Sequence, residues 1–358
     1  MRVIISGGGT AGHINPAIAI AEEIKKREPQ SEILFIGTPG GMENKLVKNA
    51  GYPIEHIEIR GLKRSLSPDN LKTVMMAFKA FSESKKIIKN FKPDIVIGTG
   101  GYVCGPPLLA ASKLNIPTLI HEQNVPPGMV VRMMAPRADI TAISFPETKE
   151  LLKNAKRTEL TGNPLREGIV NMKNTETEKP LVMISGGSLG AGKINDTLFE
   201  IIERGKKLDF DICASVGERN FEAFMKKAED NGVEIPGNIE ILPYIHNMDE
   251  VLSKASVAIT RAGAITVSEL LAAGKPAIII PSPNVVHDHQ TMNAKFFENC
   301  GAGIMIRESE LTADVLLLNL GKMISDKELL VKMSECGKKA AMLSAAEEIY
   351  SLAKEITA

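Results

Sequence analysis

The sequence predicts an α/β protein made of two doubly wound domains, each built on a parallel sheet. Short runs rich in β-branched residues alternate with longer stretches that have the spacing of amphipathic helices, which is typical of parallel strands joined by crossover helices. The chain has 358 residues, too many for one typical domain and well suited to two. In such sheets, ligands bind outside the carboxyl ends of the strands, so we expect the functional residues there.

Apolar runs bounded by polar residues, glycine or proline mark the candidate strands. We expect strands at 2–6, 32–37, 53–59, 93–98, 116–121 and 138–144 in the first half, and at 180–185, 210–216, 238–242, 255–260, 276–281 and 302–306 in the second. The segment 173–180 is polar and lacks periodicity, which predicts an interdomain hinge. The segment 340–356 is an amphipathic helix that we expect to pack back across this hinge.

Composition narrows the classes of function. The formal net charge is zero, so any contact with nucleic acid or membrane must come from a local patch. Cys104, Cys213, Cys300 and Cys336 lie far apart without a C-x-x-C pair, as expected for reduced thiols in a cytoplasmic protein. A strand is expected from residue 2, which argues against a signal peptide, and no apolar run approaches the ~18 to 20 residues of a membrane span. We therefore expect a soluble or peripheral protein.

The first loop has a glycine pattern with two possible meanings. Residues 7–12 satisfy G-x-G-x-x-G, which suggests dinucleotide binding, but that fingerprint also needs an acidic residue at the end of the second strand. The only acidic residue of that strand, Glu32, lies at its start instead, so the interpretation as an NAD-binding loop is disfavoured. His13 stands where the helix should begin, and Pro16 follows within its expected first turn. The glycines still predict close backbone approach to an anionic or hydroxyl-rich ligand.

Further clusters follow other predicted strands. Residues 98–107 and 186–191 form two more glycine loops, and although one such loop could be only a tight turn, three favour ligand binding. The run HEQN, residues 121–124, places four polar side chains directly after a buried strand, which indicates a face toward a ligand. In the segment 260–276, Gly263 opens a helix whose amides can bind a phosphate or sugar oxygen.

Two side chains in the second half are candidates for binding the sugars of a ligand. Glu269, nearly two turns into the helix that Gly263 opens, could accept two hydrogen bonds from a ribose diol, or it could be a solvated surface residue. Gln290 lies at a loop-to-helix junction and could bind sugar hydroxyls.

Two sequence motifs that resemble metal sites have a spacing or position that argues against metal binding. His287, Asp288 and His289 are adjacent and splay apart, and the pair Asp209 and Asp211 begins its strand at the end away from the loops. We expect no protein-bound metal and no tightly bound cofactor.

Six motifs occur in one order along most of the chain. They are GGTAGH at 8–13, GGYVCGP at 100–106, HEQN at 121–124, GNPLR at 162–166, GGSLGA at 186–191 and RAGAITVSELLAAGKPAI at 261–278. In these motifs the chain closely resembles the MurG family of bacterial glycosyltransferases. That family transfers N-acetylglucosamine from UDP-GlcNAc to undecaprenyl-pyrophosphoryl-MurNAc-pentapeptide (lipid I), giving lipid II for peptidoglycan synthesis, cell shape and cell division.

The resemblance implies a GT-B fold, two Rossmann-like domains facing a cleft, with the C-terminal helix crossing back to the first. The implied N-terminal domain, which takes the acceptor and faces the membrane, is 1–163 with 341–358. The implied donor domain is 164–340. Partners would be UDP-GlcNAc, lipid I and the inner leaflet of the cytoplasmic membrane, with other cell-wall synthesis proteins as further candidates, and not nucleic acid. The enzyme would be peripheral on the cytoplasmic face.

Site residues carry over by position. The implied donor contacts are Thr10, Ala11, Gly12, Asn124, Arg166, Ser188, Ile245 through its backbone, Ala264, Ile265, Thr266, Val267, Ser268, Glu269 and Gln290. The implied acceptor contacts are Gly9, His13, Gly100, Gly101, Tyr102 and His121. The sequence departs from the family pattern at Ala11 (usually Gly), Leu189 (Gln), Ala262 (Ser) and Thr291 (the second of two Gln), and the changes at Leu189 and Thr291 leave some donor contacts open.

The implied reaction is an in-line displacement at the anomeric carbon by the MurNAc 4-hydroxyl, with inversion. It needs a base for the hydroxyl proton and stabilisation of the departing UDP. Arg166, Ser188 and the amides beside Gly263 could stabilise the diphosphate. His13 is the first candidate for the base, since its unperturbed pKa lies near neutrality, and Glu122 is the alternative.

The segment 67–92 predicts a membrane-facing helix. The expected apolar stripe is Leu71, Val74, Met75, Phe78 and Phe81. The surrounding basic residues are Lys63, Arg64, Lys72, Lys79, Lys85, Lys86, Lys89 and Lys92, against only Asp69 and Glu83. An apolar stripe with a basic border suits an anionic membrane surface, although the stripe alone could equally be core. We take Leu71, Lys72, Met75, Phe78 and Lys79 as the membrane face.

Three other functions fit parts of the pattern. A lipid glycosyltransferase acting on diacylglycerol shares some of the motifs, and a non-hydrolysing UDP-GlcNAc epimerase shares the architecture. The glycine pattern of the first loop, taken alone, would indicate an NAD-dependent oxidoreductase.

Overall fold

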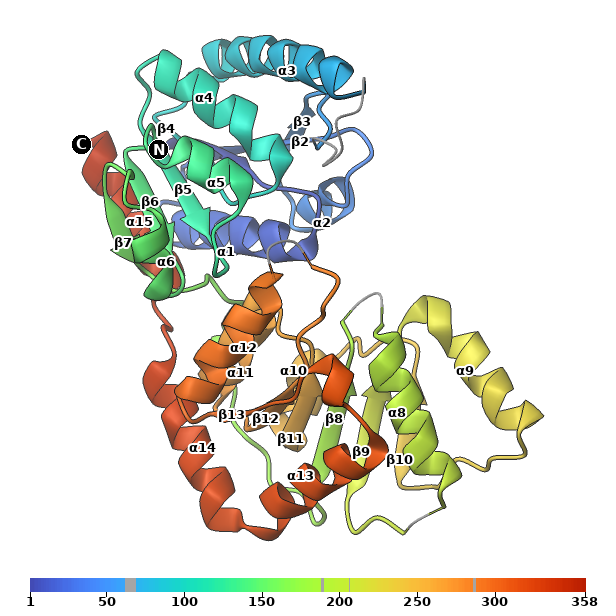
Figure 1. Cartoon of the computed structure of the whole chain (residues 1–358). Helices are drawn as coiled ribbons and strands as arrows, with labels where there is room; N and C mark the ends of the chain where they lie inside the picture. Colours follow the sequence, from blue (N-terminus) through green and yellow to red (C-terminus); the bar gives the residue numbers. More distant parts are fainter. Residues whose placement is uncertain (62–68, 188–189, 206, 286–287) are drawn as a thin grey trace. The chain divides into compact units, whose positions relative to one another are not determined.

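The computed structural model describes residues 1–61, 69–187, 190–205, 207–285 and 288–358, which divide into two compact units (Figure 1). The N-terminal unit comprises Met1–Arg166 and Met342–Ala358, and the C-terminal unit comprises Glu167–Ala341. Each unit is built on its own parallel sheet.

The sheet of the N-terminal unit has seven strands in the order β3-β2-β1-β4-β5-β6-β7, all parallel. They are β1 (Arg2–Ser6), β2 (Glu32–Gly37), β3 (Ile54–His56), β4 (Ile95–Gly98), β5 (Thr118–Glu122), β6 (Ile140–Ile143) and β7 (Thr158–Leu160). The first six confirm the strands predicted in this half. The sequence did not predict β7, because this three-residue edge strand is too short and too polar to show a pattern.

Helices cover both faces of this sheet. Alternate strand residues point to opposite faces, so Ile4 of β1 packs with α3 (Asp69–Phe91), α4 (Gly105–Lys113) and α5 (Met129–Met134). Its neighbours Val3 and Ile5 pack instead with α1 (Ala11–Arg27) and α15 (Ala345–Thr357). The remaining elements of this unit are α2 (Glu43–Asn49), η1 (Tyr102–Cys104) and α6 (Glu147–Leu151).

The C-terminal unit repeats this plan with a six-stranded parallel sheet in the order β10-β9-β8-β11-β12-β13. Its strands are β8 (Leu181–Ser185), β9 (Asp211–Ser215), β10 (Ile239–Leu242), β11 (Ala255–Thr260), β12 (Ala277–Ile279) and β13 (Gly303–Met305). Its helices are α7 (Glu167–Val170), α8 (Gly192–Glu203), α9 (Glu218–Asp230), α10 (Met248–Lys254), α11 (Ala264–Ala273), α12 (His289–Asn299), η3 (Glu308–Glu310), α13 (Ala313–Ser325) and α14 (Lys327–Ala340). All six strands predicted for this half are confirmed, and α8, α9 and α13 bury their apolar faces in one cluster on the sheet.

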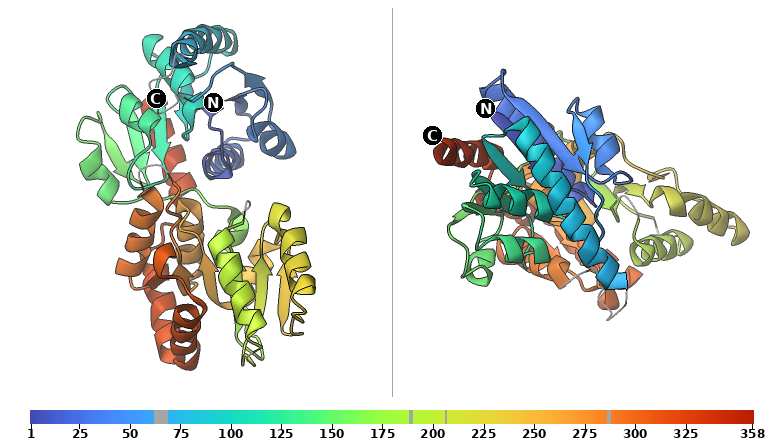
Figure 2. Two further views of the ribbon diagram at one scale, coloured as in Figure 1. Left: turned by 45° about the vertical axis from the view of Figure 1, so that its right-hand side comes forward. Right: turned by 90° about the horizontal axis from the view of Figure 1, so that it is seen from above.

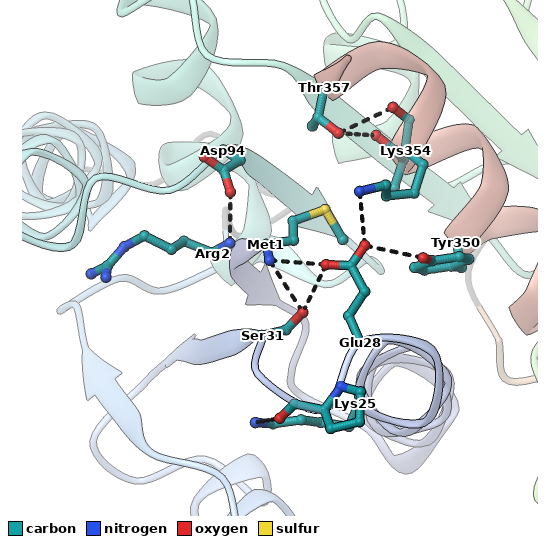
Figure 3. Close-up of polar contacts among 11 residues, drawn as sticks. Met1, Arg2, Lys25, Glu28, Ser31, Asp94, Tyr350, Lys354 and Thr357 are labelled. Atoms are coloured by element: carbon teal, nitrogen blue, oxygen red, sulfur yellow. Dashed lines mark hydrogen bonds and ion pairs between the residues drawn. The ribbon is translucent and has the colours of Figure 1, made fainter.

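The last helix, α15, belongs to the N-terminal unit, as predicted, and it packs against α1. The Glu28 carboxylate accepts hydrogen bonds from the Met1 ammonium at 3.0 Å, from Tyr350 Oη at 3.1 Å and from Lys354 Nζ at 2.8 Å (Figure 3). These contacts hold the pKa of Glu28 down at about 2, chiefly through the bonds from Lys354 and the N-terminus. A second ion pair joins Arg157 to Glu355 at 2.6 Å.

The expected hinge at 173–180 lies within the C-terminal unit. Its residues bond to that unit, since Thr175 N donates to Ser253 O at 3.1 Å and Asn174 Nδ2 donates to Ala273 O at 3.4 Å. The boundary between the units falls earlier, between Arg166 and Glu167. Lack of periodicity therefore marked an irregular segment correctly, but not the point where the chain changes unit.

Helix α3 packs along α4 on the outside of the N-terminal unit, and in the view from above it lies in front of the unit's other elements (Figure 2). Its buried side is formed by Thr73, Ala80, Ser84, Ile87 and Ile88. The predicted stripe lies mostly on a different side, where Val74, Met75 and Phe78 are 44%, 66% and 71% exposed. Among the described helices, none combines the length and apolar character that crossing a bilayer requires.

Candidate functional site

In each sheet the strand order reverses at one point, between β1 and β4 in the N-terminal unit and between β8 and β11 in the C-terminal unit. Crossovers leave such a point in opposite directions, so the loops after the two strands separate and leave room for a ligand. The residues predicted for the site follow β1, β4 and β5 in one unit and β8, β11 and β12 in the other.

The two glycine loops of the N-terminal unit contact each other through their backbones. Gly8 N donates to Gly100 O at 3.4 Å, and a Cβ atom at Gly101, whose φ is 78°, would lie 2.3 Å from Gly8 O. A Cβ atom at Gly100 would lie 2.5 Å from His13 Nδ1. Glycine is therefore required for this contact, which also seats the His13 ring against the second loop.

His13 lies in the first turn of α1, which begins at Ala11. The helix therefore starts earlier than the position of His13 suggested, and Pro16 falls in its second turn rather than its first. His13 N donates to Thr10 O at 3.0 Å, and Thr99 Oγ1 donates to His13 O at 2.8 Å, so the backbone is fixed on both sides. The side chain is half-buried, while Gly9 and Thr10 beside it are exposed and Ala11 and Gly12 are half-buried.

We expected the side chains of the HEQN run to face a ligand, but most of them are buried in the protein. His121, Glu122 and Gln123 are buried, at 0%, 2% and 2% exposure, and only Asn124 is half-buried. β5 lies inside the sheet between β4 and β6, so the side chains at its end turn into the protein. Tyr102, at 39% exposure and close to Gly9, remains open to solvent.

Glu122, the alternative base, holds the loop that follows it. Its two carboxylate oxygens accept hydrogen bonds from Asn124 N at 2.8 Å and from Gly128 N at 2.7 Å. Burial raises the pKa of Glu122 to about 7 against the lowering effect of these bonds. This pKa would suit a base, but the burial of the carboxylate and its bonds to the backbone give it a role in folding the loop.

His121 is also fully engaged within the protein, which argues against the direct acceptor contact expected for it. Its Nε2 lies 2.9 Å from Gly162 O and 3.1 Å from Ser144 Oγ. Burial lowers the pKa of His121 to about 4, so the ring is neutral at physiological pH. Ser144 continues the network, donating a hydrogen bond to Asn163 Oδ1 at 2.8 Å.

Sequence reasoning missed Glu43, which braces the first glycine loop from α2. It is 1% exposed, and its carboxylate accepts from Thr38 N at 2.9 Å, Thr38 Oγ1 at 2.8 Å and Gly9 N at 3.3 Å. Burial acts to raise its pKa, but these bonds outweigh that effect and the pKa is lowered. A glutamate in the first turn of a short helix is too common a pattern to have revealed this role.

In the C-terminal unit, α11 begins directly after Gly263, as predicted. Ile265, Thr266, Ser268 and Glu269 are half-buried and remain candidates for side-chain contact with a ligand. The other predicted contacts of this unit, Ala264, Val267 and Ile245, are buried at 5%, 0% and 1% exposure, so only their backbones could reach a ligand.

Two side chains join the loops of this unit. Arg261 forms an ion pair with Glu308 and donates from Nη1 to Ile280 O at 3.2 Å. Gln290, the second residue of α12, accepts a hydrogen bond from Ser282 N at 2.8 Å through Oε1, a bond that does not use its amide nitrogen. Ala262, where the family has serine, is fully buried.

The remaining predicted positions are less well defined by the structure or are not described by it. Ser188, Leu189 and His287 lie outside the described residues, and Arg166 is exposed at the end of the N-terminal unit's first segment. Asp288 Oδ1 accepts a bond from Thr291 Oγ1 at 2.6 Å, and Asp211 begins β9, as the sequence indicated. In the described parts of the chain, no three His, Cys, Asp or Glu side chains cluster as metal ligands.

Comparisons with known proteins agree with the two-unit architecture. The sequence model of the glycosyltransferase family 28 N-terminal domain matches residues 3–143, and that of the family's C-terminal domain matches residues 181–349. The UDP-N-acetylglucosamine–N-acetylmuramyl-(pentapeptide) pyrophosphoryl-undecaprenol N-acetylglucosamine transferase of Acetivibrio thermocellus is 46% identical over 99% of this chain and 98% of its own. The enzyme of the same name from Caldanaerobacter subterraneus is 44% identical over the whole of both chains.

Among solved structures, the crystal structure of Acinetobacter baumannii MurG superposes with a TM-score of 0.79. It shares 32% identity and covers 99% of each chain. This match confirms the GT-B type of fold.

Proposed function

The chain belongs to glycosyltransferase family 28 and, within it, to the N-acetylglucosamine transferases just described. From this premise we propose that it transfers N-acetylglucosamine from UDP-GlcNAc to the MurNAc 4-hydroxyl of lipid I. The product is lipid II, which is used in peptidoglycan synthesis. The structural observation that carries this proposal is the position of His13. Its half-buried ring lies where the strand order of the N-terminal sheet reverses, seated against Gly100 beside the exposed Gly9 and Thr10.

His13 takes the role of general base. As the 4-hydroxyl oxygen bonds to the anomeric carbon, its proton passes to the imidazole. The bond from that carbon to the phosphate oxygen breaks, and its electron pair leaves with UDP. Glu122 is the weaker candidate because both of its oxygens bind backbone amides of its own loop. Gly9, Gly100, Gly101 and Tyr102 form the acceptor side. His121 is buried and is linked to His13 through Gln123.

The donor binds to the C-terminal unit. Amides at the start of α11 face the diphosphate, because a helix N-terminus carries partial positive charge. Glu269, half-buried in the second turn, accepts hydrogen bonds from the ribose diol, and Gln290 contributes its amide nitrogen. Thr10, Ala11, Gly12, Asn124, Arg166 and Ser188 complete the donor contacts that we propose.

Turnover does not depend on a protein-bound metal in this scheme. Arg166 and the α11 amides stabilise the negative charge that develops on UDP. Chelation of divalent ions should leave the turnover of a soluble lipid I analogue unchanged. Loss of turnover in the Asp211→Ala variant would contradict the scheme.

The enzyme is peripheral on the cytoplasmic face of the membrane, where its lipid acceptor stays. Support comes from α3, whose Val74, Met75 and Phe78 are exposed although the helix buries its opposite side. Lys79, predicted as part of this face, forms ion pairs with Glu58 at 2.5 Å and Glu83 at 3.7 Å, so its charge is partly offset. Leu71 and Lys72 belong to the same predicted face, but their side chains, with Lys63 and Arg64, lie outside the described part of the chain.

Sedimentation with anionic vesicles tests this face. We expect the double substitution Met75→Ser and Phe78→Ser to weaken binding strongly, because these are the two most exposed large apolar side chains among the described side chains of the helix. Lys79→Ala should have a smaller effect, since Lys79 is already paired. Equal binding by the double variant and the wild type would rule out α3 as the docking surface.

The activity itself is tested with radiolabelled UDP-GlcNAc and a soluble lipid I analogue, with diacylglycerol offered separately. Transfer to the muramyl acceptor alone supports the proposal. Transfer to diacylglycerol would contradict it and support the alternative hypothesis of a lipid glycosyltransferase. Incubation with UDP-GlcNAc alone detects an epimerase. A rise in melting temperature with NAD but not with UDP-GlcNAc would favour an oxidoreductase.

A further inference from the structure

A continuous line of hydrogen bonds connects the half-buried His13 to the buried end of β5. His13 Nδ1 lies 3.0 Å from Gln123 Oε1, and Gln123 Nε2 lies 2.8 Å from His121 Nδ1. On its other side, His121 Nε2 lies 2.9 Å from Gly162 O. The middle member of this line, Gln123, is 2% exposed.

The backbone fixes the orientation of the Gln123 amide. Its Nε2 also lies 2.7 Å from Thr99 O, a carbonyl oxygen that can only accept a hydrogen bond. Turning the amide over would place two oxygen atoms at that distance, so Nε2 must face Thr99. The carbonyl oxygen Oε1 of Gln123 therefore faces His13.

The same reasoning fixes both histidines. Since Gln123 Nε2 donates to His121 Nδ1, the neutral His121 ring carries its hydrogen on Nε2, where Gly162 O accepts it. Since Gln123 Oε1 can only accept, His13 must carry a hydrogen on Nδ1. The basic lone pair of a neutral His13 ring then lies on Nε2.

We infer that Gln123 is a positioning residue for the transfer reaction, holding His13 in the Nδ1–H tautomer so that Nε2 is the atom that takes the acceptor's proton. This inference rests on the proposed function and on the proposed role of His13. Gln123 does not touch the substrate in this scheme. It acts through His13, as the third group of a catalytic triad acts by orienting its base.

The geometry explains why a glutamine serves here. An amide presents an acceptor to His13 and donors to Thr99 O and His121 in one buried side chain, which satisfies all three partners. A carboxylate would lack those donors, and an apolar side chain would leave Thr99 O and His121 Nδ1 without the hydrogen bonds that the amide donates to them.

The first test is the tautomer of His13 itself, read from nitrogen-15 chemical shifts of labelled full-length protein at a pH where the ring is neutral. The resonance is assigned by its loss in His13→Ala. We expect the Nδ1–H form in the wild type and a shift toward the Nε2–H form in Gln123→Met, which has similar size and no amide. A wild-type ring in the Nε2–H form, or a tautomer unaffected by Gln123→Met, would overturn the inference.

The second test separates turnover from binding. Gln123→Met should lower kcat at least about tenfold while the KM for UDP-GlcNAc changes less than about threefold, because a wrongly oriented base affects the chemical step. A shifted tautomer with unchanged kcat would also overturn the inference. Inactivity of the wild type would instead contradict the proposed function, and the tautomer measurement would still stand.

Two further variants keep the test independent of folding. Gln123→Glu retains an acceptor toward His13 Nδ1 in either protonation state, so it should keep the wild-type tautomer and more activity than Gln123→Met. Thr118→Val is the control for lost buried hydrogen bonds, because Thr118 is fully buried at the other end of β5 and bonds to Asp139 at 3.0 Å. It should lower the melting temperature without changing the tautomer or kcat per folded molecule. A kcat loss in Thr118→Val as large as that in Gln123→Met would show that the effect is only structural.

Discussion

The two units place their candidate site residues at equivalent points of similar sheets, but they differ in how far the side chains at those points are buried and bonded to the protein. In the N-terminal unit, the loops after β1, β4 and β5 are fixed by buried polar side chains, among them Glu43, His121 and Gln123. In the C-terminal unit, the loops after β11 and β12 lead into helices that carry half-buried side chains, such as Glu269 in the second turn of α11 and Gln290 at the start of α12.

This difference suits the two chemical tasks that we propose for the units. A base must be held in one orientation and one tautomer, which favours a rigid, fully bonded surrounding. A nucleotide sugar offers many hydroxyl and phosphate oxygens, so helix amides and several partly exposed side chains can share its binding. Substitutions at His13 and Gln123 in the first unit should therefore change mainly kcat, and those at Glu269 and Gln290 in the second mainly the KM for the donor.

The largest effect is expected for His13→Ala. Losing a general base typically lowers kcat by about 10²- to 10⁴-fold, while donor binding in the other unit should persist. Steady-state kinetics with a soluble lipid I analogue measure both parameters. A near-normal kcat would move the role to Glu122 or to neither residue and would remove the proposed division of tasks.

Replacing a glycine by alanine should cost far more in the first unit's site than in the second's. Gly101→Ala adds a Cβ atom 2.3 Å from Gly8 O at a positive φ, so we expect a loss of about 3–5 kcal/mol in the free energy of unfolding. Gly187→Ala has a similar φ of 84° but no atom of the described residues within 4 Å of the added Cβ, so about 1–2 kcal/mol is expected. Hydrogen exchange in β1 and β8 compares the two, and equal losses would show that close backbone contact does not distinguish the sites.

Glu269→Ala should act on the donor. Losing hydrogen bonds to a buried diol costs about 1–3 kcal/mol, which corresponds to a rise in the KM for UDP-GlcNAc of roughly 5- to 150-fold. The kcat at saturating donor should change much less. An unchanged KM would refute the assignment of Glu269 to the ribose.

The smallest effect concerns the polar cluster that joins α15 to the N-terminal unit. The pKa of Glu28 is about 2 in the folded protein and lies near 4.5 when unperturbed, so its contribution is complete above about pH 4.5 and disappears as pH falls toward 2. Because Glu28 is partly exposed, we expect Glu28→Gln to cost only about 1 kcal/mol at pH 7. Denaturant unfolding should show this difference shrinking at pH 3, and a difference that grows on acidification would contradict the assignment.

Much of the fold could be predicted because buried parallel strands are apolar runs with clear ends. The edge strand β7 could not be predicted from the sequence, and neither could the side of α3 that is buried. On α3, the buried side is made partly of Thr73, Ala80 and Ser84, which give no strong hydropathy signal, so the exposed Met75 and Phe78 could equally have been core.

The site was predictable as a set of loops but not as a set of contacts. Sequence alone cannot tell whether a polar side chain at a strand end bonds to a ligand or to the protein. For HEQN the answer lay in Thr99 and Gly162, which are distant in sequence and supply only backbone carbonyls to Gln123 and His121. The roles of Glu43 and Gln123 followed only once these partners were located.

The return of α15 to the first unit also constrains the order in which the chain can fold during synthesis. Ile349 and Ala353 belong to the apolar cluster on the α1 side of the first sheet, yet they are synthesised only after the whole second unit. The first 166 residues therefore emerge with part of that sheet face uncovered, and it stays uncovered while the whole second unit is made. Exposed apolar surface of this kind favours aggregation, so the nascent first unit is exposed to that risk until α15 has been made and has packed on α1.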